Sequence, residues 1–123
     1  MLILPGGGAG TERLENSLAV LQLVREVHAK EAYIAAICAA PAILADMGLL
    51  KGRNAVCYPA SPFRERLTEG GAVYREDAGV VRDGHIVTAK AAGVSVDFGL
   101  TLVELLKGEY AAQSVKDKMF YNA

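Results

Sequence analysis

Apolar residues follow two different patterns along this chain, and the two patterns alternate. Residues 1–4 and 33–37 are short, continuous apolar runs, which are typical of strands buried on both faces of a parallel sheet. Between them, leucine and valine recur at spacings of three and four residues, which predicts one amphipathic helix over 12–29. Strands that alternate with helices favour an α/β fold in which helices cover both faces of a mainly parallel sheet.

The second half of the chain continues this alternation. Pro41 suits the first turn of a short helix, because its missing N–H costs nothing there, and Gly48 suits the end of that helix. Ser95 can cap a later helix over 96–107. The other predicted elements are a strand over 55–58, a helical turn over 63–68 ended by Gly70-Gly71, a hairpin over 80–87 that reverses at Asp83-Gly84, and a stop at Gly108.

Length and composition limit the classes of function. The chain has 123 residues, of which 52% are hydrophobic, so one compact domain can bury a core. A net charge of −1 gives no reason to expect a nucleic-acid or acidic-membrane partner. The apolar runs are far shorter than the roughly 18 residues of a membrane span, and the first residues lack the pattern of a signal peptide.

Cysteine usage points to a reducing compartment. The two cysteines, Cys38 and Cys57, make neither a disulfide framework nor a cluster of metal ligands. We therefore expect a cytoplasmic protein with no metal and no cofactor.

Cys38 is the strongest candidate for chemistry. It follows the apolar run 33–37 and precedes Ala39, Ala40 and Pro41, so it lies at a tight turn between a strand and a helix. A thiol at such a corner faces the helix N-terminus, whose partial positive charge stabilises the reactive thiolate. The corner is similar to a nucleophile elbow, although no Gly-x-Ser-x-Gly motif is present. The alternative is an inert thiol in the core.

The glycine-rich segment 6–10 follows the first strand and has two interpretations. It lacks the Gly-Lys-Ser/Thr of a phosphate-binding loop, and Thr11 stands where a dinucleotide-binding loop needs its third glycine. The loop is either a plain strand-to-helix turn or part of an oxyanion hole. In the second case, the N–H groups of Gly7 and Ala39 would point at one developing negative oxygen.

Three elements together resemble a known family. They are Leu-Pro-Gly-Gly at 4–7, Ala-Ile-Cys-Ala at 36–39 and Ala-Ala-Gly at 91–93, in this order and at this separation. The chain is similar to the ThiJ/PfpI family, in the DJ-one-like branch that holds parkinsonism-associated deglycase and glyoxalase III relatives, from residue 1 to about 112. The resemblance implies a flavodoxin-like three-layer sandwich, with residues 1–123 as a single class I glutamine amidotransferase-like domain.

The resemblance also implies that an N-terminal strand–helix–strand portion is lacking. In the family that portion supplies a glutamate that hydrogen-bonds the nucleophilic thiol, and no residue here matches it. Glu12, Glu15 and Glu31 lie after the glycine loop and do not fill the role. We expect a fragment, because an exposed sheet edge invites aggregation. The alternatives are completion by another polypeptide and a truncated gene product.

Histidine is a doubtful partner for the thiol. His28 ends a charged helix and His85 follows the hairpin turn, so both are expected to face solvent. Many relatives have a histidine before the proline after the next strand, where this chain has Tyr58. This departure argues against a Cys–His hydrolase, because tyrosine is a poor base at neutral pH. Tyr58 either donates a hydrogen bond in a substrate pocket or packs at a strand end.

Two further residues are weaker candidates. Cys57 is expected to be a small buried side chain in a strand, or else a thiol that resolves an oxidised Cys38 if the two strand ends are adjacent. Lys90 matches the start of a loop that in relatives lies near the active site and the dimer contact. The resemblance therefore makes Lys90 a candidate for orienting a carbonyl or carboxylate substrate.

Two classes of function are consistent with these residues. The first is a cysteine-dependent reaction on a small carbonyl such as methylglyoxal or on a glycated substrate, of glyoxalase III or deglycase type. The second is a non-enzymatic sensor of oxidative stress or a chaperone, in which Cys38 is oxidised. The resemblance also covers amidotransferase-like proteins labelled as thiazole biosynthesis, and it implies a homodimer. Fold alone does not choose among these.

Overall fold

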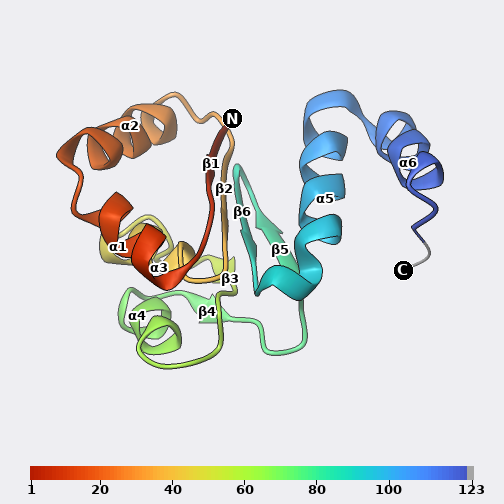
Figure 1. Ribbon diagram of the computed structural model, residues 1–123. Helices are drawn as coiled ribbons and strands as arrows, with labels where there is room; N and C mark the ends of the chain where they lie inside the picture. The colour runs from red at the N-terminus through yellow and green to blue at the C-terminus, as the bar shows by residue number, and fades with distance from the viewer. Residues whose placement is uncertain (122–123) are drawn as a thin grey trace.

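The computed structural model describes residues 1–121, and its centre is a four-stranded sheet (Figure 1). The strand order is β1 (Leu2–Leu4), β2 (Ile34–Ile37), β6 (Ile86–Ala89) and β5 (Val80–Asp83). The first three strands are parallel, and β5 pairs antiparallel with β6. The predicted α/β fold with a mainly parallel sheet is confirmed, and so is the hairpin that reverses at Asp83-Gly84.

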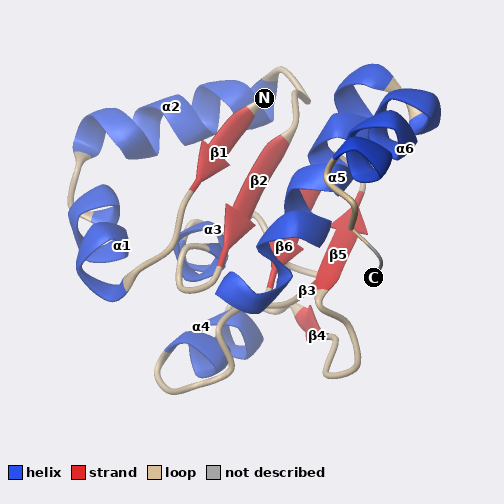
Figure 2. Cartoon of the chain, turned by 45° about the vertical axis from the view of Figure 1, so that its right-hand side comes forward, coloured by secondary structure: helices blue, strands red, loops and turns tan. Residues whose placement is uncertain are grey.

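Helices cover both faces of this sheet, which gives three layers (Figures 1 and 2). One side carries α1 (Gly8–Glu15), α2 (Leu18–Ala29) and α3 (Pro41–Asp46), with α4 (Phe63–Glu69) below them in Figure 1. The other side carries the 3-10 turn η1 (Ala92–Val94), α5 (Ser95–Lys107) and α6 (Glu109–Lys118). A second small sheet pairs β3 (Asn54–Ala55) with β4 (Val73–Tyr74) in parallel.

The core is divided by the sheet because side chains alternate along each strand. On β2, Ile34 and Ala36 belong to the larger apolar cluster, which also contains Val24 of α2. Ala35 faces the opposite side, in a smaller cluster with Phe98 and Leu102 of α5. Burial on both faces of β2 explains its unbroken apolar sequence.

The single helix predicted over 12–29 is wrong, because two helices occupy this region. The first begins at Gly8, and the chain leaves helical geometry at Asn16 and Ser17. The Asn16 side chain donates to the Glu12 carbonyl over 2.9 Å, and the Ser17 hydroxyl accepts the Val20 N–H at 3.3 Å. Polar side chains that bond to nearby backbone groups stop one helix and cap the next.

Two further boundaries and one additional helix differ from the predictions. The strand expected over 55–58 is confined to Asn54–Ala55, because the following residues bond across to other segments instead of continuing a ladder. Ser95 is the first residue of α5 and not its cap, and its hydroxyl donates to the Ala92 carbonyl. Helix α6 lies outside the predicted elements, since most of its residues are polar or exposed.

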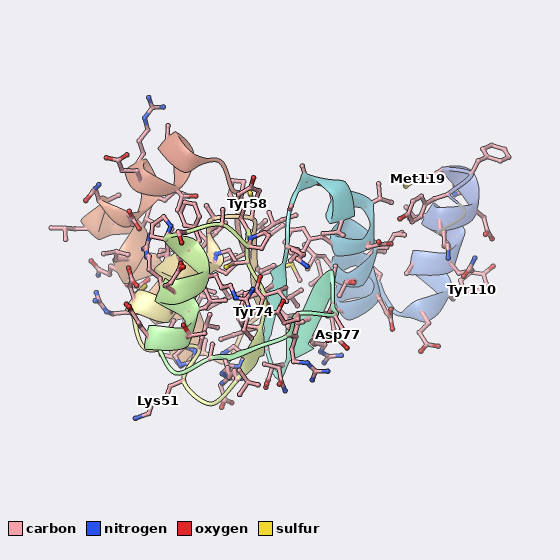
Figure 3. The ribbon with its side chains drawn as sticks, turned by 90° about the horizontal axis from the view of Figure 1, so that it is seen from below. Lys51, Tyr58, Tyr74, Asp77, Tyr110 and Met119 are labelled. Carbon is pink, nitrogen blue, oxygen red and sulfur yellow. The ribbon has the colours of Figure 1, made fainter. Side chains whose placement is uncertain are left out.

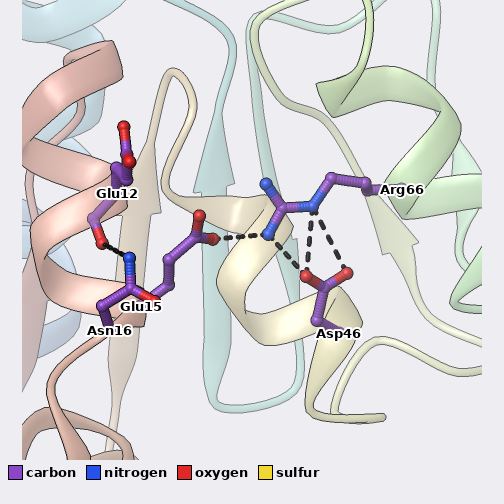
Figure 4. Close-up of polar contacts among 5 residues, drawn as sticks. All are labelled: Glu12, Glu15, Asn16, Asp46 and Arg66. Atoms are coloured by element: carbon purple, nitrogen blue, oxygen red, sulfur yellow. Dashed lines mark hydrogen bonds and ion pairs between the residues drawn. The ribbon is translucent and has the colours of Figure 1, made fainter.

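An arginine joins three helices on the same side of the sheet (Figure 4). Arg66 of α4 donates to Asp46 of α3 over 2.5 Å and to Glu15 of α1 over 2.6 Å. The Arg66 side chain is only 20% exposed, so solvent screens these pairs less than it screens a surface pair. The cluster therefore ties α4 to both α1 and α3.

Strand β1 lies at the edge of the four-stranded sheet. Leu4 is buried against the larger core cluster, whereas Ile3 on the opposite face is 49% exposed. Among residues 1–121, no helix has both the length and the apolar character that crossing a membrane requires.

Candidate active site

Cys38 occupies a strained corner directly after β2. Its backbone φ is +66°, in the left-handed region that side-chain-bearing residues rarely adopt. Two hydrogen bonds hold the corner in place: the Cys38 N–H donates to the Ala89 carbonyl over 2.9 Å, and the Cys38 carbonyl accepts the Tyr58 N–H over 2.7 Å. Segments from three parts of the chain therefore determine where this thiol lies.

The surroundings of Cys38 fit a reactive thiol better than an inert core thiol. Cys38 is partly exposed, whereas Ala39, Ala40 and Pro41, which follow it, are buried. Helix α3 begins at Pro41, so the predicted turn from strand to helix is present. Strained backbone that neighbouring segments hold in place is typical of functional sites.

Gly6 is the glycine that packs against the thiol. A Cβ built on Gly6 would lie 2.5 Å from the Cys38 Cβ, 2.8 Å from the Ile37 carbonyl oxygen and 3.4 Å from the Cys38 sulfur. Only a residue without a side chain fits so close to this corner. Nothing in the sequence alone distinguishes Gly6 from the other glycines of the loop. The register of β1 on β2 explains this position. Leu4 pairs with Ala36, and two residues further along each strand direction stand Gly6 and Cys38.

The two N–H groups predicted to form an oxyanion hole remain available. Gly7 has a φ of +88°, which directs the chain from β1 into α1. Among the hydrogen bonds of the described residues, none is donated by the N–H of Gly7 or of Ala39. Both residues flank the contact between Gly6 and Cys38, so their N–H groups are candidates to bind a negative oxygen formed beside the sulfur.

Tyr58 lies beside the thiol through its backbone. Besides the bond from its N–H to Cys38, its ring stands edge-on to the Phe63 ring, with 6.5 Å between centroids. The residue is 42% exposed, and Figure 3 shows it on the side of the molecule seen from below. An exposed tyrosine at this place is accessible to a ligand that reaches Cys38.

The Lys90 side chain is bonded to the segment before β5 and not to the Cys38 corner. Its backbone follows Ala89 at the end of β6, and its N–H donates to the Gly79 carbonyl over 2.9 Å. Its ammonium group donates to the Glu76 carbonyl over 3.3 Å. Lys90 therefore lies at the same end of the sheet as Cys38, with one of the three N–H donors of its ammonium group bonded to Glu76.

The surroundings of Cys57 are those of a buried structural thiol. It is completely buried, and its sulfur donates to the Tyr58 carbonyl at 3.2 Å. Burial raises the pKa of the Cys57 thiol from 9.0 to about 12, against the opposing effect of a hydrogen bond with Tyr74. The bond between Tyr58 and Cys38 brings the segment of Cys57 next to the strained corner, as the resolving-thiol alternative requires. The burial of Cys57, however, favours the structural interpretation.

The two histidines lie at the opposite end of the sheet from Cys38. The His85 carbonyl accepts the Ile34 N–H where β2 and β6 begin, whereas the Cys38 N–H bonds to Ala89 where they end. The expectation that both face solvent separately is wrong, because His28 and His85 are partly buried against each other with 2.9 Å between Nδ1 and Nε2. No local pattern in the sequence signals this contact.

Other cavities in the molecule do not include the Cys38 corner. One of about 630 Å³ and one of about 350 Å³ lie between α5 and α6. Figure 3 shows α6, marked by Tyr110 and Met119, far to the side of Tyr58. Within residues 1–121, no group of three or more histidine, cysteine, aspartate or glutamate side chains is placed to hold a metal ion. The two cavities are therefore separate from the Cys38 corner.

Comparison with known proteins assigns the chain to a family. The model of the DJ-1/PfpI family matches residues 1–105. The chain belongs to the DJ-1/PfpI family. This confirms the resemblance that the strand, glycine-loop and cysteine-turn segments suggested.

Individual members of the DJ-1/PfpI family agree with this assignment. Protein DJ-1alpha of Drosophila melanogaster is 39% identical over 98% of this chain and 54% of its own length. The crystal structure of Drosophila melanogaster DJ-1beta superposes with a TM-score of 0.90 at 32% identity, covering 98% of this chain and 63% of that one. Isonitrile hydratase of Pseudomonas putida is 33% identical over 94% of this chain and 49% of its own length.

The chain spans between about half and three fifths of the length of the curated relatives named DJ-1alpha and Parkinson disease protein 7 homolog, the latter from Danio rerio. Family membership and fold rest on the shared part. Activity, substrate and partners of the whole protein are matters for proposal.

The contrast between the two thiols predicts selective labelling in this DJ-1/PfpI member. With iodoacetamide at pH 8, we expect Cys38 to be alkylated at least about 100-fold faster than Cys57, because Cys57 is buried and, at a pKa of about 12, only about one molecule in ten thousand carries its thiolate. Mass spectrometry of Cys38→Ser and Cys57→Ser variants measures each thiol alone. Equal labelling of the two thiols in folded protein would contradict the assignment.

Proposed function

We propose that this protein carries out a cysteine-dependent reaction on small reactive carbonyl compounds such as methylglyoxal, of glyoxalase III or deglycase type. One observation carries the proposal: a partly exposed thiol, Cys38, is held at a φ of +66° against Gly6, with two unbonded N–H groups beside it. A nucleophile fixed in position next to hydrogen-bond donors for a developing oxyanion is an arrangement suited to attack on a carbonyl.

The proposed first step is addition of the Cys38 thiolate to the aldehyde carbon. A C–S bond forms, the electrons of the C=O π bond move to the oxygen, and the N–H groups of Gly7 and Ala39 stabilise the negative charge. Such donors are worth about 3 kcal/mol of transition-state stabilisation in well-formed sites. Protonation gives a hemithioacetal; proton transfers within it give a thioester, and water cleaves the C–S bond to release the hydroxy acid and the free thiol. In the deglycase variant the substrate is the adduct of the aldehyde with an amine: the Cys38 sulfur replaces the amine on the same carbon, the amine leaves with a proton, and the same hemithioacetal results.

The proton transfers need a general acid or base. We propose that none of the three glutamates after the glycine loop fills this role. Glu15 is bonded to Arg66, and Glu31 lies near His85 at the other end of the sheet. Glu12 is exposed on α1. We propose that a glutamate from the family's N-terminal strand–helix–strand portion assists Cys38, as the resemblance implies. Tyr58, exposed beside the corner, is proposed to contact the substrate.

Enzyme activity receives support from one relative, and the alternative function from another. Isonitrile hydratase, 33% identical to this chain, shows that an enzyme name occurs within the family. Toxoplasma gondii DJ-1, whose structure is described as oxidized, superposes with a TM-score of 0.84 at 31% identity. Since Cys38 is partly exposed, oxidation to a sulfenic or sulfinic acid in a stress sensor is the second candidate function.

The proposal also covers the assembly of the protein, its location and its partners. We propose a homodimer in the cytoplasm that acts on a small carbonyl compound or a glycated substrate. The near-neutral charge of the chain supports the expectation that nucleic acid and membrane are not its partners.

One paired experiment tests the proposal. Full-length protein is incubated with methylglyoxal, and lactate is measured; in parallel, Cys38 is titrated with hydrogen peroxide and followed by mass spectrometry. Lactate formation at a rate that rises with protein concentration is the expected result. Full-length protein that forms no lactate and releases no amine from glycated substrates, while Cys38 oxidises stoichiometrically at micromolar peroxide, would replace the enzyme with the sensor.

A further inference from the structure

The contact between His28 and His85 has no part in the chemistry of Cys38. His28 is in the last turn of α2, and His85 lies between the hairpin turn and β6, 57 positions later in the chain. Their ring centroids are 5.0 Å apart, with 29° between the ring planes. Both residues are partly buried and partly exposed, so an ion from solvent can reach them.

We propose that His28 Nδ1 and His85 Nε2 together bind a divalent transition-metal ion, with Cu²⁺ or Ni²⁺ as the metals that fit. Neutral imidazole nitrogen is a good ligand for these ions. The two nitrogens lie 2.9 Å apart and share a hydrogen bond, in which the tautomers decide which ring donates. A metal ion that binds here displaces the shared proton, and both nitrogens then act as ligands. The histidines come from two elements that the sheet already holds together, so little ordering is needed on binding.

The separation of the nitrogens selects the geometry. With metal–nitrogen bonds of about 2.0–2.1 Å, two nitrogens 2.9 Å apart subtend about 90° at the ion. That angle is the one between neighbouring ligands in square-planar or octahedral coordination, which Cu²⁺ and Ni²⁺ prefer. A tetrahedral ion such as Zn²⁺ needs its nitrogens about 3.3 Å apart. Water fills the other positions, because the described residues bring no third ligand of the usual kinds into the group.

Charged side chains from neighbouring segments surround His85. Burial lowers the pKa of His85, and the nearby Arg53 and His28 lower it further, while Glu31 opposes them. Arg53 is partly balanced by Asp83, whose carboxylate lies 3.5 Å from it. The Glu31 carboxylate offsets part of the charge that a bound cation brings.

The test uses NiCl₂ as the probe, with full-length protein carrying Cys38→Ser so that the exposed thiol does not bind the metal. Isothermal titration calorimetry at pH 7.5 should show one Ni²⁺ per chain. His28→Gln and His85→Gln each remove one of the two proposed ligand nitrogens. Each should weaken binding at least about tenfold, since even partners that only orient a ligand cost 10–100-fold when lost. Gln22→Ala, an exposed change on the same helix, is the matched control and should not alter binding.

Three results would overturn the proposal: no Ni²⁺ binding, binding that each histidine variant merely halves, which means two independent sites, and binding that neither variant changes. Circular dichroism establishes that each variant is folded. If either variant unfolds, electron paramagnetic resonance of Cu²⁺ added to the Cys38→Ser protein decides the matter. Hyperfine coupling to two imidazole nitrogens supports the site, and coupling to one or none overturns it.

Discussion

Replacing Cys38 with alanine should abolish turnover of methylglyoxal by the full-length protein, by a factor of 10³ or more. The reason is that, among residues 1–121, the other thiol cannot replace it: Cys57 is buried, and burial raises its pKa to about 12. Loss of a covalent nucleophile commonly removes several orders of magnitude of rate. Lactate formation under saturating methylglyoxal measures the effect, and Cys57→Ser is the matched control that should retain activity.

The same assay separates this mechanism from a Cys–His mechanism. Histidine as general base would make His28→Ala or His85→Ala slow the chemical step by 10²–10⁴-fold. We expect both variants to change the rate less than about twofold, because both histidines lie at the far end of the sheet. Tyr58→Phe removes the hydroxyl of a residue whose backbone bonds to Cys38, and it should cost less than about tenfold. Wild-type turnover by Cys38→Ala would end the enzyme proposal.

Gly6→Ala should damage both stability and activity, although it adds only one methyl group. The new Cβ would lie 2.5 Å from the Cys38 Cβ and 2.8 Å from the Ile37 carbonyl oxygen, so the strained corner must move. Overpacking of this kind costs about 1–3 kcal/mol of the free energy of unfolding. A displacement of the thiol by about 1 Å should lower the rate about 100-fold. Chemical denaturation and lactate formation measure the two effects.

Gly8→Ala is the matched control for Gly6→Ala. Gly8 begins α1 two residues later, and a Cβ there meets no atom within 4 Å. Alanine is a better helix former than glycine, so this variant should be as stable as the wild type or up to about 1 kcal/mol more stable. If Gly6→Ala behaved like Gly8→Ala in both measurements, close packing of Gly6 against Cys38 would not control the site.

Much of the fold was predictable because burial leaves a direct trace in sequence. Unbroken apolar residues at 33–37 predicted a central strand, and β2 is buried on both faces by two separate clusters. The turn at Cys38 was predictable for the same reason, because a buried run meets small residues and then Pro41. The helix over 12–29 was predicted wrongly, since its apolar spacing continues across Ser17 while the backbone follows the cap.

The details of the site needed the tertiary structure. From sequence, any of the glycines at 6–8 can lie against the thiol, and only the pairing of β1 with β2 places Gly6 there. Likewise, sequence placed Lys90 near the site, but its ammonium group bonds to the Glu76 carbonyl.

The sequence by itself determined the alternation of strands with helices, the corner that holds Cys38 and the family to which the chain belongs. These follow from local properties: the periodicity of burial, the conformations that glycine and proline favour, and short motifs. Only the tertiary structure decided which glycine touches the thiol and that His28 meets His85. Such contacts join segments more than thirty positions apart, so they depend on strand register and helix packing, which no local pattern encodes.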